Sequence, residues 1–191
     1  MKLTPWLLRT AYSEGAFPMG EDDGSVQFYV SKKRALFPIE GMHVSRSLSK
    51  AIRKSDFQVR FNENFEQVMR SCLREEHNWI TEEIIQVFCQ IHQEKWAHCC
   101  EVWRGNSLIG GIYGLSLGTC FSAESMFHRQ TNGSKLALWA MIEKCREVGY
   151  EVFDAQVMNP HLQSLGAIEV SHDDYLKLLK GCLAKRPPEI R

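Results

Sequence analysis

Three polar side chains interrupt two otherwise apolar stretches in the second half of the chain. Glu124 lies within "TCFSAESMFH", and Asp154 and Gln156 lie within "YEVFDAQVM". If the second stretch is a strand, alternation places Asp154 and Gln156 on one face. A carboxylate among apolar neighbours is costly unless it has a partner or opens into a cleft. These residues could form the polar centre of a binding or catalytic site, or they could lie on an ordinary solvated strand face.

The elements that would position these groups follow from the hydrophobic pattern. Three strands are predicted over "HCCEVWR", "SLIGGIYGLSLG" and "TCFSAESMF", with tight turns at Gly105-Asn106 and Gly118. A long helix follows over "SKLALWAMIEKCREVG", and "YEVFDAQVM" predicts the next strand. Because a strand–helix–strand crossover makes its two strands parallel, this order matches the core of GCN5-related acyltransferases. We therefore predict an α+β fold with a GCN5-like C-terminal domain.

The first half of the chain has a more helical pattern. Thr4 and Pro5 begin a helix that Gly15 ends, and a short strand is expected in "SVQFYV". Further helices are predicted over "SRSLSKAIRKSD", "NENFEQVMRSCLREE" and "TEEIIQVFCQIHQE", and a last one over "HDDYLKLLKGCL". The predicted organisation is a small, mainly helical N-terminal lobe over 1–42, the GCN5-like domain over 43–182 and a flexible tail over 183–191.

The loop before the long helix limits the choice of donor. GCN5-related acyltransferases use a Q/R-x-x-G-x-G/A loop, whose backbone N–H groups bind the pyrophosphate of coenzyme A at a helix N-terminus. Here the loop begins at Gln130 and reads Q-x-x-G-x-K. Lys135 stands where a small residue would allow the phosphate to approach. The loop therefore disfavours coenzyme A as the donor.

Composition and charge set wider bounds. Lys plus Arg and Asp plus Glu both number 23, so the formal net charge is zero. A local basic patch is still compatible with that sum. No apolar run reaches the roughly 18 residues of a membrane span. We expect a cytoplasmic protein without a membrane partner, with an organellar protein whose transit peptide is absent as the alternative. The seven Cys include no C-x-x-C pair, and the cluster His92, His98, Cys99 and Cys100 fits no zinc spacing, so no metal is expected.

Several long motifs together resemble the leucyl/phenylalanyl-tRNA–protein transferase family. They are "GGIYGLSLGTCFSAESMF", "NGSK", "DAQVMNPHLQSLGA", "YSEGAFPM", "HVSRSL" and "WIT", and they span about Leu8 to Leu179. The chain begins close to its "YSEGAFPM" segment, as in a variant with a short N-terminal lobe.

The resemblance implies a direct ester aminolysis without a cofactor. The donor would be tRNA charged with Leu or Phe, with Met as a further candidate. The acceptor would be the α-amine of a protein with N-terminal Arg or Lys, which marks that protein for N-degron degradation. Holding both reactants in line supplies on the order of 7 kcal/mol or more of barrier reduction, so no covalent enzyme intermediate is required.

The resemblance also assigns roles to individual residues. Glu124, Asp154 and Gln156 match the polar centre of the family. On chemical grounds we expect Glu124 to hold the α-ammonium group of the amino acid on the tRNA. We expect Gln156 to position the acceptor amine and Asp154 to bear its proton or cation, although these last two roles are interchangeable. Trp79 would stack on the terminal adenine, and Asn159 would lie near the ribose or peptide. The pocket for the transferred side chain would comprise Ile112, Phe121, Met126, Leu138, Met141, Cys145 and Phe153. The tRNA backbone would contact Arg46, Lys50, Arg53, Lys54 and Lys135.

Other interpretations remain open from the sequence. The apolar residues are equally compatible with plain core, and the basic helix with an ordinary solvated face. The family usually has aromatic residues at the positions of Met141 and Cys145, and a Met at the position of Ile112. These differences leave the preference for Leu or Phe open. The rival functions are a coenzyme A-dependent N-acetyltransferase of the same fold, an arginyl or aspartate/glutamate-directed transferase, and a non-catalytic tRNA-binding module.

Overall fold

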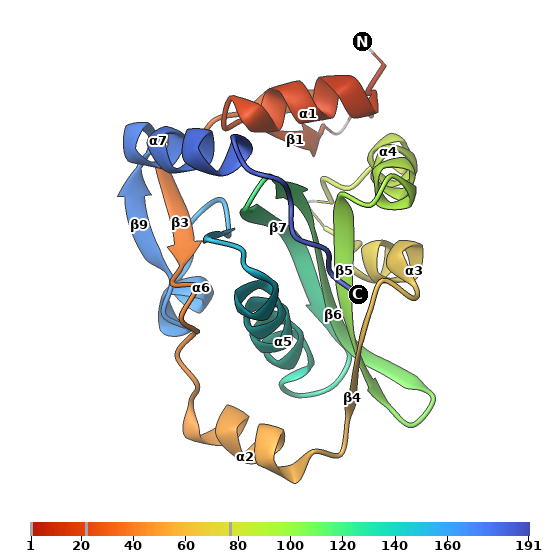
Figure 1. Ribbon diagram of the computed structural model, residues 1–191. Helices are drawn as coiled ribbons and strands as arrows, with labels where there is room; N and C mark the ends of the chain where they lie inside the picture. The colour runs from red at the N-terminus through yellow and green to blue at the C-terminus, as the bar shows by residue number, and fades with distance from the viewer. Residues whose placement is uncertain (1, 22, 77) are drawn as a thin grey trace.

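The computed structural model describes residues 2–21, 23–76 and 78–191, which form seven helices and two sheets (Figure 1). The helices are α1 (Pro5–Ser13), α2 (Arg46–Lys54), α3 (Phe65–Ser71), α4 (Glu82–Gln93), α5 (Gly133–Val148), α6 (Pro160–Ser164) and α7 (His172–Leu183). The strands are β1 (Phe17–Gly20), β2 (Val26–Tyr29), β3 (Lys33–Phe37), β4 (Gln58–Phe61), β5 (Ala97–Arg104), β6 (Ser107–Leu117), β7 (Cys120–His128), β8 (Val152–Asp154) and β9 (Ile168–Ser171).

The large sheet has the strand order β4-β5-β6-β7-β8-β3-β9. Strands β4 to β7 form an antiparallel meander, and the crossover through α5 makes β8 parallel to β7. This is the predicted order of three strands, a helix and a parallel strand. The α+β fold class and the acyltransferase-like core are therefore confirmed.

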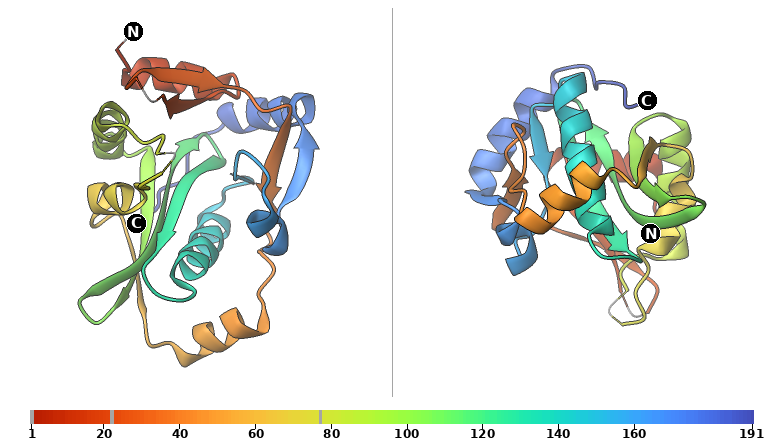
Figure 2. Two further views of the ribbon diagram at one scale, coloured as in Figure 1. Left: turned by 180° about the vertical axis from the view of Figure 1, so that it is seen from behind. Right: turned by 90° about the horizontal axis from the view of Figure 1, so that it is seen from below.

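Helices cover both faces of the large sheet (Figures 1 and 2). One core lies between the sheet and α1, α3, α4 and α7, and it contains Cys99 and Tyr113. The other core lies between the sheet and α2, α5 and α6, and it contains Cys100 and Ile112. Neighbouring strand residues thus enter opposite cores. This explains the nearly continuous apolar runs of the central strands, since strands that are buried on both faces lose the polar alternation.

The N-terminal segment differs from its prediction. Helix α1 begins as expected, with the Thr4 side chain accepting a hydrogen bond from the backbone of Leu7 at 3.2 Å. Among the described residues of 1–42, however, α1 is the only helix, and β1 pairs with β2 in a hairpin. Strand β3 lies in the large sheet between β8 and β9. The predicted boundary at residue 42 therefore separates β3 from the sheet to which it belongs.

The C-terminal segment 183–191, expected to be a flexible tail, packs against the domain. The Ile190 side chain is 4% exposed. Its carbonyl oxygen accepts a hydrogen bond from Asn62 Nδ2 at 2.7 Å, and the Pro188 carbonyl oxygen accepts one from the Tyr150 hydroxyl at 3.2 Å. None of the helices in the described ranges combines the length and apolar character that crossing a bilayer requires.

Candidate active site

A pocket of about 980 Å³ opens where β7 and β8 stop pairing. The last paired residues are Ser122 and Asp154. Beyond them β7 continues to His128, and the chain after β8 turns away. Residues from both segments line the pocket, together with the N-terminal turn of α5, part of α6 and the loop that carries Trp79. The strand separation thus creates the cavity at the place where the motifs predict the polar centre.

Glu124 lies at an irregularity in β7. Tyr113 of β6 opposes Ser125, and the next residue, Gly114, opposes Ala123, so Glu124 is the extra residue of a β-bulge. Ala123, Glu124, Ser125 and the following Met126 all line the pocket, which strict strand alternation does not allow. The bulge therefore turns Glu124 toward the cavity.

The environment of Glu124 suits proton exchange near neutral pH. Burial raises the pKa of Glu124 to about 7, although the nearby side chains of Tyr12 and Gln156 act in the opposite direction. The side chain is half-buried and opens to the pocket. Among the described residues, Oε2 finds no hydrogen-bond partner, and Oε1 has only a long contact of 3.5 Å from the Ser122 hydroxyl. Glu124 thus has a buried oxygen without a donor in the described part of the chain, and a carboxyl group with this pKa can take up a proton at neutral pH.

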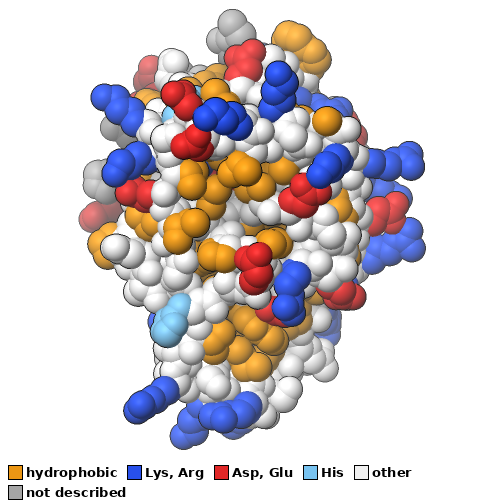
Figure 3. All heavy atoms as spheres, turned by 60° about the vertical axis from the view of Figure 1, so that its left-hand side comes forward, with side chains coloured by type: hydrophobic (Ala, Val, Ile, Leu, Met, Phe, Trp, Pro, Cys, Tyr) orange, Lys and Arg blue, Asp and Glu red, His pale blue; other side chains and the backbone are white. Residues whose placement is uncertain are grey.

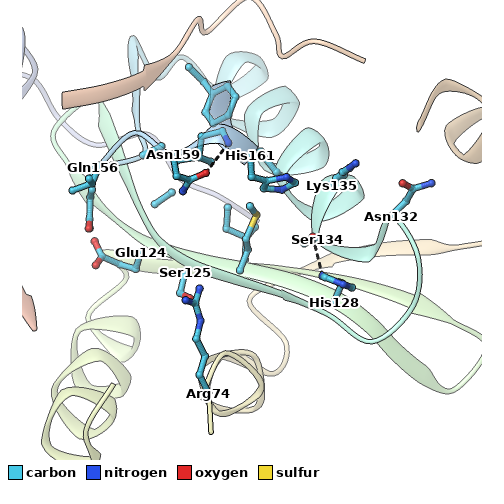
Figure 4. A pocket seen from close by; sticks show the side chains of 18 of the residues that line it. Arg74, Glu124, Ser125, His128, Asn132, Ser134, Lys135, Gln156, Asn159 and His161 are labelled. Atoms are coloured by element: carbon cyan, nitrogen blue, oxygen red, sulfur yellow. Dashed lines mark hydrogen bonds between the residues drawn. The ribbon is translucent and has the colours of Figure 1, made fainter. Parts of the chain in front are cut away.

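Gln156 enters the pocket by a different route from the one predicted. Strand β8 ends at Asp154, and Gln156 has a left-handed backbone with φ 62°. Its N–H donates to Asp154 Oδ1 at 2.8 Å, and its carbonyl accepts from the backbone N–H of Ala35 at 2.9 Å. The prediction that Asp154 and Gln156 share one strand face is therefore wrong. The turn nevertheless aims Gln156 toward Glu124 across the pocket (Figure 4).

Asp154 lies behind the pocket, where it is fully buried in an ion pair. Arg34 donates to Asp154 from Nε at 2.9 Å and from a terminal nitrogen at 2.7 Å. The Tyr175 hydroxyl at 2.9 Å and the Ser122 hydroxyl at 3.2 Å donate to the same carboxylate. Its oxygens are thus occupied by protein donors, and Asp154 is absent from the pocket lining. This geometry suits a residue that positions Gln156 rather than one that binds a substrate cation.

The seven residues expected to form the apolar pocket divide into two groups. Ile112, Met126 and Leu138 line the cavity. The other four are fully buried beneath it, in the core between α5 and the sheet, and they are Phe121, Met141, Cys145 and Phe153. Sequence reasoning missed Phe37 and Leu162, which also line the cavity. Phe37 comes from β3, and no local pattern indicates that this strand reaches the site.

Trp79 and Asn159 both line the pocket. Trp79 lies in the loop before α4, and Asn159 directly precedes α6. The carbonyl of Trp79 accepts a hydrogen bond from the backbone N–H of Gly20 at 2.9 Å, so the β1–β2 hairpin supports the loop that carries Trp79. Asn159 Oδ1 accepts from the backbone N–H of Leu162 at 2.9 Å and caps α6. Asn159 therefore both begins α6 and faces the cavity.

The residues predicted to contact tRNA lie in two places. Lys135 lines the pocket, whereas Arg46, Lys50, Arg53 and Lys54 are exposed on α2 outside it. Lys54 is paired with Asp56 at 2.6 Å. In Figure 3, several Lys and Arg side chains lie at the lower end of the molecule, where Figure 1 places α2. A polynucleotide that followed these charges would run from α2 toward the α5 end of the pocket.

The pocket is basic in character. Glu124 is the only carboxylate among the described residues that line it. Sequence reasoning missed most of its basic residues, which are Arg74, His128, Arg129 and His161. The one signal available was that His128 directly follows the "ESMF" segment. A cavity with several cationic groups and one carboxylate suits a phosphate-bearing substrate.

The loop before α5 is built for packing. A Cβ atom on Gly133 would lie 2.2 Å from the Ile109 carbonyl oxygen, so glycine allows α5 to approach β6. The Lys135 side chain lines the cavity at this helix end. Within the described ranges, no group of three or more His, Cys, Asp or Glu side chains could hold a metal ion.

Two family models match the chain. One, described as leucyl/phenylalanyl-tRNA protein transferase, matches residues 36–180, and one for the N-terminal domain of the same family matches residues 1–31. A leucyl/phenylalanyl-tRNA–protein transferase of Cereibacter sphaeroides is 43% identical over 184 residues, which cover 95% of this chain and 86% of the relative. One of Rubrobacter xylanophilus is 41% identical, with 96% of each chain covered.

The likeness to solved structures is weaker. The C-terminal domain of a putative lysylphosphatidylglycerol synthetase from Agrobacterium fabrum is 14% identical with a TM-score of 0.47, and 82% of this chain and 53% of that one are covered. Such a score carries no argument about function. The sequence relatives do establish the family, because two of them are more than 40% identical to this chain and each match covers most of both sequences. The chain is a transferase, and it belongs to the leucyl/phenylalanyl-tRNA–protein transferase family.

Proposed function

We propose that the chain transfers Leu or Phe from charged tRNA to the α-amine of proteins with N-terminal Arg or Lys. The names of the relatives support the two amino acids and the tRNA donor. The basic pocket supports a nucleotide substrate, and its apolar wall of Ile112, Met126 and Leu138 supports an uncharged side chain. Charged tRNA is a cytoplasmic substrate, so we infer that the reaction takes place there. The preference for Arg and Lys rests on the family resemblance.

The observation that carries the mechanism is Glu124, the single carboxylate among the described residues that line the pocket, where burial raises its pKa to about 7. The α-amine nitrogen attacks the ester carbonyl carbon, a C–N bond forms and the bond to the ribose oxygen breaks. The amine loses one proton, and the ribose oxygen gains one. Glu124 accepts the first proton and returns it to the leaving oxygen. A carboxyl group with this pKa can do both at neutral pH.

Gln156 and Asp154 have supporting roles in this proposal. Gln156 orients the amine through its side-chain carbonyl, because an amide is too weak a base to hold the proton. Asp154 acts through Gln156, since it fixes the backbone of that residue and remains paired with Arg34. We therefore assign the proton to Glu124 and treat Asp154 as a positioning residue.

The donor lies along the remaining walls. Trp79 stacks on the terminal adenine, and Asn159 contacts the ribose. The aminoacyl side chain packs against Ile112, Met126 and Leu138, with Phe37 and Leu162 completing the wall. Beyond the pocket, the tRNA backbone follows the exposed cations of α2.

The test is a transfer assay. The protein is incubated with tRNA charged with Leu, Phe, Met or Arg and with peptides that bear each N-terminal residue, and products are identified by mass spectrometry. We expect transfer of Leu and Phe to peptides with N-terminal Arg or Lys. Efficient transfer of Arg, or equal transfer to all peptides, contradicts the proposal. Glu124→Gln should abolish most transfer, and Glu147→Gln is the matched control because Glu147 is exposed on α5 outside the pocket.

A further inference from the structure

Three basic side chains gather at the end of the pocket opposite Glu124. His128 ends β7, Lys135 lies in the first turn of α5, and His161 lies in α6, and all three line the cavity (Figure 4). The Ser134 hydroxyl lies 3.5 Å from His128 Nδ1 at the same end. The three elements are far apart in the sequence, so only the fold brings these groups together.

The mutual influence of these groups indicates a site prepared for an anion. Burial, the charge of Lys135 and the charge of His128 all lower the pKa of His161. The one carboxylate of the described pocket lining, Glu124, lies at the far end beside Gln156. Arg129, which also lines the pocket, donates a hydrogen bond to the Ser71 hydroxyl at 2.9 Å. Among the described residues that line the pocket, no carboxylate offsets these three basic groups at their own end, so a bound anion would relieve the repulsion between them.

The separation between the three basic groups and the apolar residues Met126 and Leu138 indicates which phosphate of the substrate could reach the basic groups. His128 follows Met126 by two residues on β7, a separation of about 7 Å in a strand. Leu138 follows Lys135 by three residues on α5, a rise of about 4.5 Å in a helix. A terminal nucleotide carries its aminoacyl ester and its 5′ phosphate on one ribose. An aminoacyl side chain against Met126 and Leu138 thus leaves that phosphate within reach of the basic end.

We propose that His128, Lys135 and His161 bind the phosphodiester on the 5′ side of the terminal adenosine, and that His161 takes up a proton when it does. The inference rests on the proposed function, because it assumes an aminoacyl-tRNA donor. It adds a phosphate subsite inside the pocket, distinct from the exposed cations of α2.

The proton uptake gives binding a defined pH dependence. Burial and the charges of Lys135 and His128 hold the pKa of His161 below its usual value, which favours the neutral imidazole. A phosphate beside it favours the charged form and raises that pKa. Affinity for the phosphodiester therefore rises as the pH falls through the pKa of the bound form, and it levels off below the pKa of the free form. Lys135 and His128 are the charged groups that act on His161.

The experiment compares the dinucleotide cytidylyl-adenosine with its uncharged methylphosphonate analogue by calorimetry at pH 6 and pH 8. The wild-type protein should prefer the charged dinucleotide by about tenfold, as expected for charge-assisted hydrogen bonds, and more at pH 6 than at pH 8. In Lys135→Gln the two dinucleotides should bind with more nearly equal affinity. In His161→Gln the dependence of the preference on pH should weaken, because His161 no longer takes up a proton while His128 remains beside the phosphate. His43→Gln, an exposed histidine outside the pocket, is the matched control and should keep both.

Three results would overturn the phosphate subsite. They are equal binding of the two dinucleotides by the wild type, no measurable binding of either, and a preference that persists unchanged in both variants. The binding measurement needs no transfer reaction, so it tests the phosphate subsite independently of the proposed transferase function. Failure of amino-acid transfer together with a normal preference for the phosphodiester would refute the proposed function and leave the subsite in place.

Discussion

Arg34 in β3 and Asp154 at the end of β8 form an ion pair in which both side chains are 0% exposed, with 2.7 Å between a guanidinium nitrogen and Asp154 Oδ2. The guanidinium also donates to the Gly15 carbonyl at 3.1 Å and lies 4.5 Å from the Tyr175 ring centre. One pair thus connects the segment after α1, two strands and α7. The same carboxylate fixes the backbone of Gln156. The pair therefore links the stability of the fold to the geometry of the site.

Replacing Asp154 with Asn should lower both stability and activity. The change leaves the Arg34 charge buried without its partner, and such a loss costs about 3–5 kcal/mol. For a chain of this size the Tm should fall by about 10 °C, measured by calorimetry. Asp173→Asn, at an exposed position in α7, is the matched control and should keep the wild-type Tm. A wild-type Tm in Asp154→Asn together with lost activity would show instead that Asp154 acts on the substrate directly.

Replacing Glu124 with Gln should reduce kcat/KM by about 10²-fold or more, because the variant lacks the proton acceptor. The wild-type rate should rise with pH through about 7 as Glu124 ionises. It should rise again near pH 8, the ordinary pKa of a free α-amine being about 8, as the acceptor loses its proton. The variant should retain only the second rise. An unchanged pH–rate profile in Glu124→Gln would remove Glu124 from the proton transfer.

The same residue should affect stability with a definite sign. The pKa of Glu124 rises from 4.5 to about 7 because burial disfavours its charged form. Between these values the unfolded chain has released a proton that the folded chain still holds, so stability falls as the pH increases across this window. Because the Glu124 side chain is only half-buried, solvent screening makes this change in the free energy of unfolding smaller. Denaturant unfolding of wild type and Glu124→Gln at pH 4 and pH 8 should show a smaller loss in the variant, and equal losses would contradict this account.

Gly20 should position Trp79. A Cβ atom at Gly20 would lie 2.4 Å from Thr81 Cγ2 and 2.7 Å from the Trp79 carbonyl oxygen. Gly20→Ala should therefore displace the loop and raise the KM for charged tRNA more than it lowers kcat, as Trp79→Ala should do more strongly. In Gly181→Ala the new methyl group would meet no atom within 4 Å, so this variant is the control with an unchanged KM. An unchanged KM in Gly20→Ala would contradict the support of Trp79 by the β1–β2 hairpin.

Replacing Met126 with Trp should fill the apolar end of the pocket. Side chains that differ by one methylene are separated by only about 1–3 kcal/mol in such a pocket, so Leu and Phe should both react in the wild type. Met126→Trp should slow the transfer of both, with the bulkier Phe more affected, as measured by mass spectrometry. Met141→Leu changes a core residue that does not line the cavity, and it should keep the wild-type ratio of Leu to Phe transfer. Normal Leu transfer by folded Met126→Trp would place the aminoacyl pocket elsewhere.

Local patterns determined most of the elements. The caps Thr4, Ser45 and Thr81 each accept the hydrogen bond that begins the predicted helix. The meander, the long α5 and the parallel β8 follow from periodicity and from turn residues such as Gly118, which has φ 58°. These features depend on residues close together in the chain, which is why sequence reasoning reached them. The family was also recognisable at this level, because its motifs are long and occur in order.

The tertiary structure decided which of the predicted site residues face the cavity. Arg34 lies 120 residues before its partner Asp154, and no local pattern pairs them. The end of β8 and the bulge in β7 both break strict alternation, so Gln156 and Glu124 reach the pocket from irregular backbone while Asp154 turns into the core. Which apolar residues line the cavity, and which basic groups meet at its far end, depends on how α5, α6 and β3 pack. Those placements come from contacts between distant segments, and the free energy of burial that selects them is a property of the folded chain as a whole.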